Sequence, residues 1–213
     1  MKFYIPKTPS CIMRFFSKYT WCFSRDVKEI YLTFDDGPTP EITQFVLDEL
    51  KKYNAKATFF CIGKNILNHP DVFKKIKKSK HSIGNHTQNH LNGWATKNKD
   101  YIDNFLQCEH IISKTLDKSA KSKLFRPPYG KIKKSQAKSI LKKGYRIIMW
   151  DVLSADFDVS TSKEECLRNV LNNTKNGSII VFHDSVKASE KLKFVLPKVL
   201  KELSEKGFVF KAI

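Results

Sequence analysis

The sequence lacks the signatures of several common classes of protein. No Gly-x-Gly-x-x-Gly segment follows its first predicted strand and no phosphate-binding loop is present, so a nucleotide-binding sheet is disfavoured. The cysteines include no Cys-x-x-Cys pair, which argues against both a disulfide framework and a thiolate zinc site. We expect buried, reduced thiols at these positions, which are Cys11, Cys22, Cys61, Cys108 and Cys166.

Long hydrophobic runs are also absent. The longest ones near the N-terminus, Cys11–Met13 and Phe15–Phe16, are too short for a signal-peptide core or a transmembrane segment. The sequence therefore predicts no transmembrane helix and a cytoplasmic location, or the cell envelope if the substrate is a wall polymer. Residues 1–27 are basic and aromatic without clear periodicity, and we expect an arm packed on the domain that can make a peripheral envelope contact.

Acidic residues are scarce relative to basic ones. The chain has 39 Lys and Arg against 21 Asp and Glu, a formal net charge of +18, which predicts attraction to polyanions. Most of the excess is lysine spread along predicted helices, as in Lys74–Lys78, which is typical of solvated helix faces. Because no recognition helix, zinc-finger spacing or stacking motif is present, we expect no specific nucleic-acid partner.

Predicted strands and helices alternate along all 213 residues, without a composition break that would mark a linker. This pattern predicts an α/β domain with about seven mainly parallel strands, either a barrel or an open doubly wound sheet. Polar clusters follow the strands, which favours a barrel with its active site at the C-terminal strand ends. The predicted strands are Ile30–Phe34, Ala57–Cys61, Ser82–Gly84, Leu124–Phe125, Tyr145–Trp150, Ser178–Phe182 and Phe208–Ala212.

The first of these strands ends in two adjacent carboxylates, Asp35 and Asp36, before Gly37 and Pro38 stop it. Adjacent residues on an extended backbone point to opposite sides, so one carboxylate could bind a cation while the other accepts a proton. A solvated Asp-Gly turn is the plain alternative for such a segment in isolation.

His86 and His90 are four residues apart, a spacing that brings both imidazoles to one side of a helical or tight turn. Together with Asp36 they predict a three-ligand site for a divalent metal ion, with open positions for water and substrate. Two exposed histidines on a polar loop are the alternative. Since no Glu follows His86, the base must come from elsewhere, and Asp35 is available.

Two further segments carry candidate catalytic groups. The prolines and glycine of Arg126–Gly130 hold Arg126 and the Tyr129 amide in preset directions, so the guanidinium can keep a carboxylate ionised and the amide can stabilise an oxyanion. His183 ends a buried strand, where desolvation and a nearby acid such as Asp156 would tune its pKa. A rigid surface turn and a structural histidine are the corresponding alternatives.

Together the segments resemble the polysaccharide deacetylase family, the NodB homology domain of carbohydrate esterase family four, from about Lys28 to the C-terminus. The resemblance implies a catalytic domain over 28–213 with a deformed (β/α) barrel that removes acetyl from an N-acetylated amino sugar. The segments that carry the resemblance are Thr33–Pro38, His86–His90, Arg126–Gly130, Asp156–Phe157 and Val181–Asp184.

The resemblance also implies a role for each site residue. Asp35 matches the general base, His183 the general acid, and Arg126 and Asp156 the residues that orient them, while the Tyr129 amide matches the oxyanion donor. Asp36, His86 and His90 match the ligands of one divalent metal ion, for which zinc is favoured over cobalt, nickel and manganese. Pro127, Phe157 and Val181 line the acetyl pocket, where Phe157 and Val181 replace the family's usual Trp and Leu.

The preferred substrate is peptidoglycan N-acetylglucosamine, followed by chitooligosaccharides and then a small acylated sugar or glycolipid. We expect an N-acetylated glycan as the partner and a monomer in solution. Two other classes remain open: a carbohydrate-binding protein that has lost catalysis on the same scaffold, and a basic polyanion-binding module with a structural metal site.

Overall fold

A single curled sheet forms the centre of the molecule. The computed structural model describes residues 4–116 and 123–213, and within them every pair of neighbouring strands is parallel, in the order β5-β4-β3-β2-β1-β7-β6 with β8 paired to the start of β1. The strands are β1 Glu29–Asp35, β2 Ala57–Cys61, β3 Ser82–Asn85, β4 Leu124–Phe125, β5 Arg146–Ile147, β6 Val152–Leu153, β7 Ile179–His183 and β8 Val209–Phe210.

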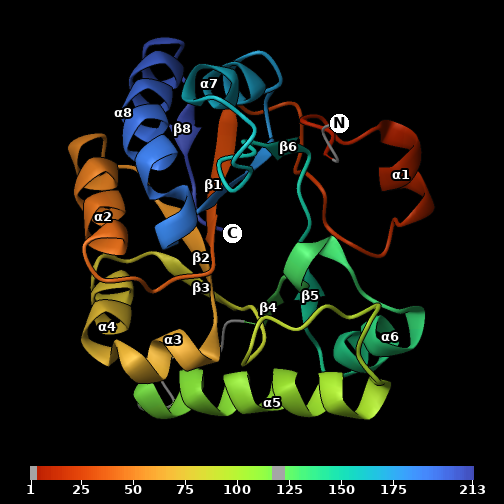
Figure 1. Cartoon of the computed structure of the whole chain (residues 1–213). Coiled ribbons are helices and arrows are strands. Elements are labelled where there is room, and N and C mark those ends of the chain that lie inside the picture. Colours follow the sequence, from red (N-terminus) through yellow and green to blue (C-terminus); the bar gives the residue numbers. More distant parts are fainter. Residues whose placement is uncertain (1–3, 117–122) are drawn as a thin grey trace.

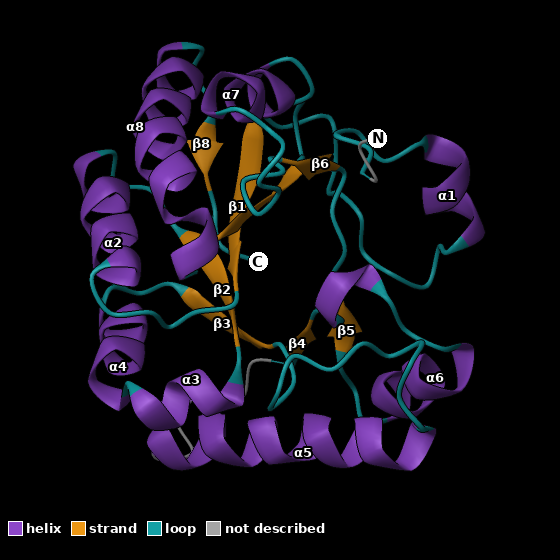
Figure 2. Cartoon of the chain, viewed as in Figure 1, coloured by secondary structure: helices purple, strands orange, loops and turns teal. Residues whose placement is uncertain are grey.

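The helices surround this sheet on the outside (Figure 1). The prediction of a deformed (β/α) barrel is confirmed, with seven strands in the curled path and helices between most of them, as the colours of Figure 2 show. The helices are α1 Ser10–Phe15, α2 Ile42–Lys52, α3 Gly63–Asn68, α4 Pro70–Lys78, α5 Asn98–Thr115, α6 Lys134–Lys142, α7 Lys163–Leu171 and α8 Ser189–Glu205, with 3-10 turns at Pro128–Gly130 and Val186–Ala188.

Strand β1 shows how the sequence divides the molecule into layers. Ile30, Leu32 and Phe34 are fully buried in the main hydrophobic cluster, which also contains residues of α2 and α8. Because side chains alternate along a strand, Thr33 and Asp35 face the other way, into the barrel. The helices therefore pack on the apolar face of β1, and the candidate site residues lie on its polar face.

Several predicted elements differ from the structure. We expected one helix over about Asn65–Ser79 from its apolar spacing, but two helices form, α3 and α4, because Pro70 begins a new helix after His69. The strand predicted over Tyr145–Trp150 forms a ladder only at β5, and β6, Val152–Leu153, is a further strand that was not predicted. Contrary to the expectation of burial, Cys11 is exposed and Cys22 is only partly buried, although all five cysteines are free thiols.

Residues 4–27 cover the side of the barrel where β5 and β6 do not pair. Isolated bridges join Lys7 to Val152, Thr20 to Ile148 and Cys22 to Ser178, and Trp21 packs into a second cluster with Phe105 of α5. Helix α1, which was not predicted, lies outside the barrel on this side (Figure 1). Among the described residues, no helix combines the length and the apolar character needed to span a membrane.

Candidate active site

The predicted site residues gather at one edge of the sheet. Asp35 and His183 are the last residues of β1 and β7, His86 follows β3, and Arg126 follows β4. Asp156 lies three residues beyond β6. Because all these strands are parallel, their carboxyl ends meet at the same edge, as the sequence predicted.

Asp35 is held by a buried guanidinium. Arg126 Nη1 donates to Asp35 Oδ1 at 2.8 Å, and the two side chains are 0 % and 5 % exposed. Arg126 Nη1 also donates to Thr33 Oγ1 at 2.7 Å. Removing either partner of such a buried pair would leave an uncompensated charge, so the pair fixes the position of the Asp35 carboxylate.

The remaining Arg126 donors bind backbone carbonyls of the next segment. Arg126 Nε donates to Ile148 O at 3.2 Å and Nη2 donates to Met149 O at 3.0 Å. The guanidinium carbon also lies 4.2 Å from the centroid of the Phe60 ring. Because each guanidinium nitrogen of Arg126 donates a hydrogen bond inside the protein, Arg126 holds Asp35 rigidly.

Asp36, His86 and His90 form the group that could hold a metal ion. Their candidate ligand atoms all lie within 4.8 Å of one another. Asp36 Oδ1 is 3.2 Å from His90 Nε2 and 3.7 Å from His86 Nε2. The sequence predicted this set of three, and the fold brings them together from the ends of β1 and β3.

The chemistry of this group fits a cation. His86 Nδ1 lies 2.8 Å from Arg126 O, and since a carbonyl only accepts, Nδ1 carries the proton and Nε2 presents a lone pair toward Asp36. Burial lowers the pKa of His86 to about 3 and also lowers that of His90, so both imidazoles are neutral. Asp36 Oδ1 is buried and accepts no hydrogen bond in the described parts of the chain. A divalent cation would satisfy all three atoms.

The backbone of these ligands is not the one expected from the sequence. Asp36 has a φ of 80°, so it turns out of the strand instead of extending it. Of the helical and tight turns predicted for His86–His90, the helical one is not formed: this segment is an irregular loop with a bend at Gln88 and Asn89, and Thr87 and His90 have φ of 65° and 55°. Such left-handed conformations are uncommon outside glycine, and here they bring two histidines and an aspartate to one point.

His183 forms a pair with Asp156. It lies on β7, which flanks β1 on the side opposite β2 and β3. His183 Nδ1 lies 2.7 Å from Asp156 Oδ1, and the His183 backbone N–H donates to Asp156 Oδ2 at 2.8 Å. Burial alone would lower the pKa of His183, but the Asp156 carboxylate, together with the charges of Asp36 and Asp35, outweighs burial and raises the pKa to about 9. His183 can therefore carry a proton at neutral pH.

The segment after Arg126 extends from the metal-binding group to the protein surface. Tyr129 has a φ of 60° and is 61 % exposed, with its ring centroid 4.5 Å from that of His90. Pro127 is buried. Phe157 packs edge to face on His183 at 5.1 Å, and Val181 lies buried in β7 two residues before His183. Three apolar side chains thus lie in the segments that border the site.

Sequence reasoning missed the residues that hold the Asp36–Gly37 turn. Asp184 accepts hydrogen bonds from the Gly37 N–H, at 3.1 Å, and from the Thr43 hydroxyl. A Cβ atom on Gly37 would lie 2.1 Å from Asp184 Oδ2, so only glycine allows this approach. Asp184 follows His183 directly, and an acid beside the histidine that ends a buried strand is the signal that could have found it.

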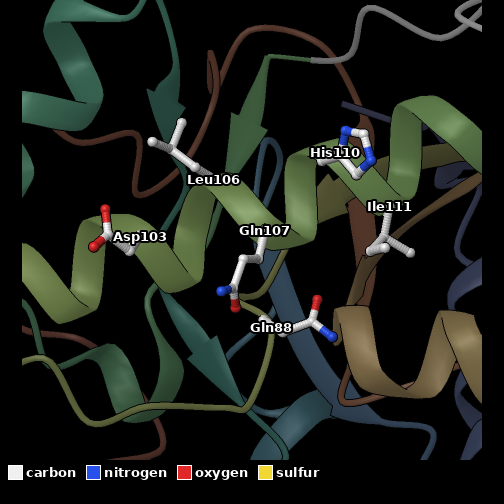
Figure 3. A pocket seen from close by; sticks show the side chains of 6 residues that line it. All are labelled: Gln88, Asp103, Leu106, Gln107, His110 and Ile111. Atoms are coloured by element: carbon white, nitrogen blue, oxygen red, sulfur yellow. The ribbon is translucent and has the colours of Figure 1, made fainter.

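A groove of about 600 Å³ lies elsewhere, along α5 (Figure 3). It contains none of the predicted site residues and is lined by Gln88, Asp103, Leu106, Gln107, His110 and Ile111. The other two histidines outside the site also have structural positions: His69 joins α3 to α4, and buried His81 accepts from the Ala57 N–H at 3.2 Å.

Comparison with known proteins agrees with this geometry. Residues 24–148 match the family model described as polysaccharide deacetylase. Two peptidoglycan-N-acetylglucosamine deacetylases of Bacillus cereus are 35 % and 34 % identical over 91 % and 90 % of this chain, and over 70 % and 89 % of their own length. A crystal structure of a peptidoglycan N-acetylglucosamine deacetylase in complex with an N-hydroxybenzamide aligns with a TM-score of 0.88 at 32 % identity, covering 97 % of this chain and 95 % of that one. The chain therefore belongs to the polysaccharide deacetylase family, whose deacetylase members hydrolyse N-acetyl amide bonds.

Proposed function

We propose that this protein is a metal-dependent deacetylase that hydrolyses the N-acetyl group of N-acetylglucosamine residues in peptidoglycan. The observation that carries the proposal is the convergence of Asp35, the Asp36–His86–His90 group and His183 at one edge of the sheet. The activity named for its similar relatives supplies the substrate. The proposed substrate implies that the protein acts in the cell envelope.

Asp36, His86 and His90 would hold one divalent metal ion, for which we favour zinc because two imidazoles and a carboxylate suit it well. When bound, such an ion lowers the pKa of water and polarises the acetamide carbonyl. The neutral state of both imidazoles and the unpartnered Asp36 oxygen support this assignment.

Asp35 acts as the general base in this proposal. Arg126 occupies Asp35 Oδ1, which leaves the second carboxylate oxygen to accept the proton of the attacking water. The amide N–H of Tyr129 donates to the acetyl oxygen as negative charge develops on it. Loss of one such donor typically raises the barrier by about 3–4 kcal/mol.

His183 acts as the general acid. Its Nδ1 is bonded to Asp156, so Nε2 faces outward with the proton that the departing sugar amine needs. The amine is a poor leaving group without that proton. Pro127, Phe157 and Val181 would contact the acetyl methyl and exclude larger acyl groups.

Acetate release measured over a panel of glycans tests the proposal. We expect the wild-type protein to release acetate from peptidoglycan glycan strands, and a chelator to abolish this release until zinc is restored. Chitooligosaccharides serve as the second substrate, since they carry the same N-acetylglucosamine without muramic acid. Acetate release that survives complete removal of metal would refute the metal-dependent mechanism, and no release from any N-acetylated glycan would refute the function.

A further inference from the structure

Trp94 is an exposed tryptophan on a tightly held loop. It is 61 % exposed, although tryptophan is usually largely buried. Its indole Nε1 donates to Ile132 O at 3.2 Å and its backbone N–H donates to Asn92 Oδ1 at 3.0 Å. Two side chains at the start of α6 also bind this loop: Gln136 donates to Gly93 O and Lys133 donates to Thr96 O. The exposed indole is therefore fixed in position.

This loop lies next to the proposed active site. Trp94 is four residues after the metal-ligand candidate His90, and the Tyr129 ring packs on His90 at 4.5 Å. The Gly93 N–H donates to Lys131 O at 3.2 Å, and Lys131 is two residues after Tyr129. The two segments that carry His90 and Tyr129 thus continue side by side away from the metal-binding group.

A lysine accompanies the exposed ring. Lys131 Nζ lies 5.4 Å from the centroid of the Trp94 ring. Within residues 4–116 and 123–213, Lys131 forms no ion pair with a carboxylate. An aromatic face beside an unpaired cation can bind a sugar ring that carries an anionic group, because the ring packs against the sugar's C–H face and the ammonium attracts the anion.

We infer that Trp94 and Lys131 form a subsite for the sugar next to the one that is deacetylated, and that this subsite selects a sugar bearing a carboxylate. The inference rests on the proposed function. In a polymer of alternating N-acetylglucosamine and muramic acid, the neighbour of each N-acetylglucosamine carries a lactyl ether. Its carboxylate is free where no peptide is attached, so peptide-free glycan strands are the preferred substrate.

The test compares three substrates and four variants. The substrates are peptide-free glycan strands, the same strands with their lactyl carboxyls amidated, and chitooligosaccharides. Lys131→Gln should raise KM about fivefold to tenfold on the first substrate alone and leave kcat unchanged, since only this substrate offers the Lys131 ammonium a carboxylate. Lys131→Arg should retain the wild-type KM. Trp94→Ala should raise KM on all three substrates, and Lys134→Gln, which neutralises a neighbouring lysine as a matched control, should change none.

Binding followed by tryptophan fluorescence keeps the two proposals separate, because it requires no turnover. Peptide-free strands should quench the fluorescence of the wild-type protein and should quench that of Trp94→Phe less. Wild-type acetate release with an equal effect of Lys131→Gln on charged and neutral substrates would overturn the subsite while leaving the deacetylase function intact. Preferred binding of the carboxylated strands without acetate release would support the subsite and refute the function. Tighter binding of strands that retain their stem peptides would assign the carboxylate to the peptide and overturn the lactyl preference.

Discussion

Asp35 and His183 are paired residues in the parallel ladder between β1 and β7. Both end their strands on the inner face of the barrel, and each has its own partner of opposite charge: Arg126 for Asp35 and Asp156 for His183. Neighbouring groups with such different environments can hold different protonation states at one pH. In the proposed mechanism, this pairing places the proton acceptor Asp35 and the proton donor His183 on adjacent strands.

Asp35→Asn should abolish turnover while retaining metal. The amide cannot accept the proton of water, and loss of a general base typically costs a factor of about 10²–10⁴ in kcat. His86→Ala should lose both activity and metal, because it removes a ligand. Acetate release and metal content per chain, measured on the same samples, check both expectations. The matched variant Asp103→Asn changes an exposed aspartate of α5 and should behave as wild type. Wild-type turnover by Asp35→Asn would show that another group is the base.

The activity should fall as the pH rises through about 9. Burial opposes protonation of His183, but Asp156, together with Asp36 and Asp35, outweighs burial and holds the pKa at about 9, so the protonated acid is present below that value and lost above it. Asp156→Asn removes the charge that raises this pKa, and the alkaline limb of the kcat profile should then move to lower pH. An alkaline limb at the same pH in both proteins would show that it does not report His183.

The free energy of unfolding should also depend on pH through the protonation of His183. The pKa of His183 in the folded protein lies above its ordinary value of 6.5, so its pair with Asp156 contributes stability fully below about pH 6.5. This contribution is lost as the pH rises through about 9. Urea unfolding of the wild type and Asp156→Asn at a series of pH values should show the two free energies of unfolding converging in this window.

The sequence predicted the strands and the side-chain chemistry better than the local backbone. Strand Ala57–Cys61 was predicted with its observed bounds because its apolar, β-branched and aromatic residues are buried on both faces. The ligand set Asp36, His86 and His90 also followed from residue type and order. The conformation of these residues did not: positive φ at Asp36 and His90 is imposed by surrounding contacts, and no local propensity favours it.

Long-range contacts explain the other differences. One strand was predicted over Tyr145–Trp150, yet this part of the chain forms two short strands, β5 and β6. Residues of the N-terminal arm make hydrogen bonds with both: Thr20 N–H donates to Ile147 O and Leu153 N–H donates to Pro6 O. The role of Asp184 in holding the Asp36–Gly37 turn could not be predicted, because its hydrogen-bond partners, Gly37 and Thr43, are distant in sequence. Such partners are set by topology, which sequence periodicity cannot supply.

Gly37→Ala should destabilise the protein and reduce its metal affinity. The new methyl would lie 2.1 Å from Asp184 Oδ2, and relieving such an overlap in a packed region typically costs about 1–3 kcal/mol. Movement of the turn would also displace Asp36. Chemical unfolding and metal titration measure the two effects. In the double variant with Asp184→Ala the methyl meets no carboxylate, so the two substitutions should cost less together than the sum of their separate effects. Strict additivity would contradict the proposed overlap.

Asp151→Ala should destabilise the whole fold, because this buried carboxylate joins the N-terminal arm to the sheet. Asp151 Oδ2 accepts from Lys7 Nζ at 2.8 Å and Arg25 Nη2 at 2.9 Å, and Oδ1 accepts from the Ile179 N–H at 2.9 Å. Lys7 and Arg25 are 29 % and 40 % exposed, so the main cost is the buried Ile179 N–H left without a partner, typically about 1–3 kcal/mol. Urea unfolding measures this loss.

Lys201→Ala, which breaks the exposed Lys201–Glu205 pair, should cost less than about 1 kcal/mol. Equal effects of the two substitutions would mean that the arm contributes nothing to stability through Asp151. Activity at low denaturant should fall with Asp151→Ala alone, since β7, which carries His183, begins at Ile179.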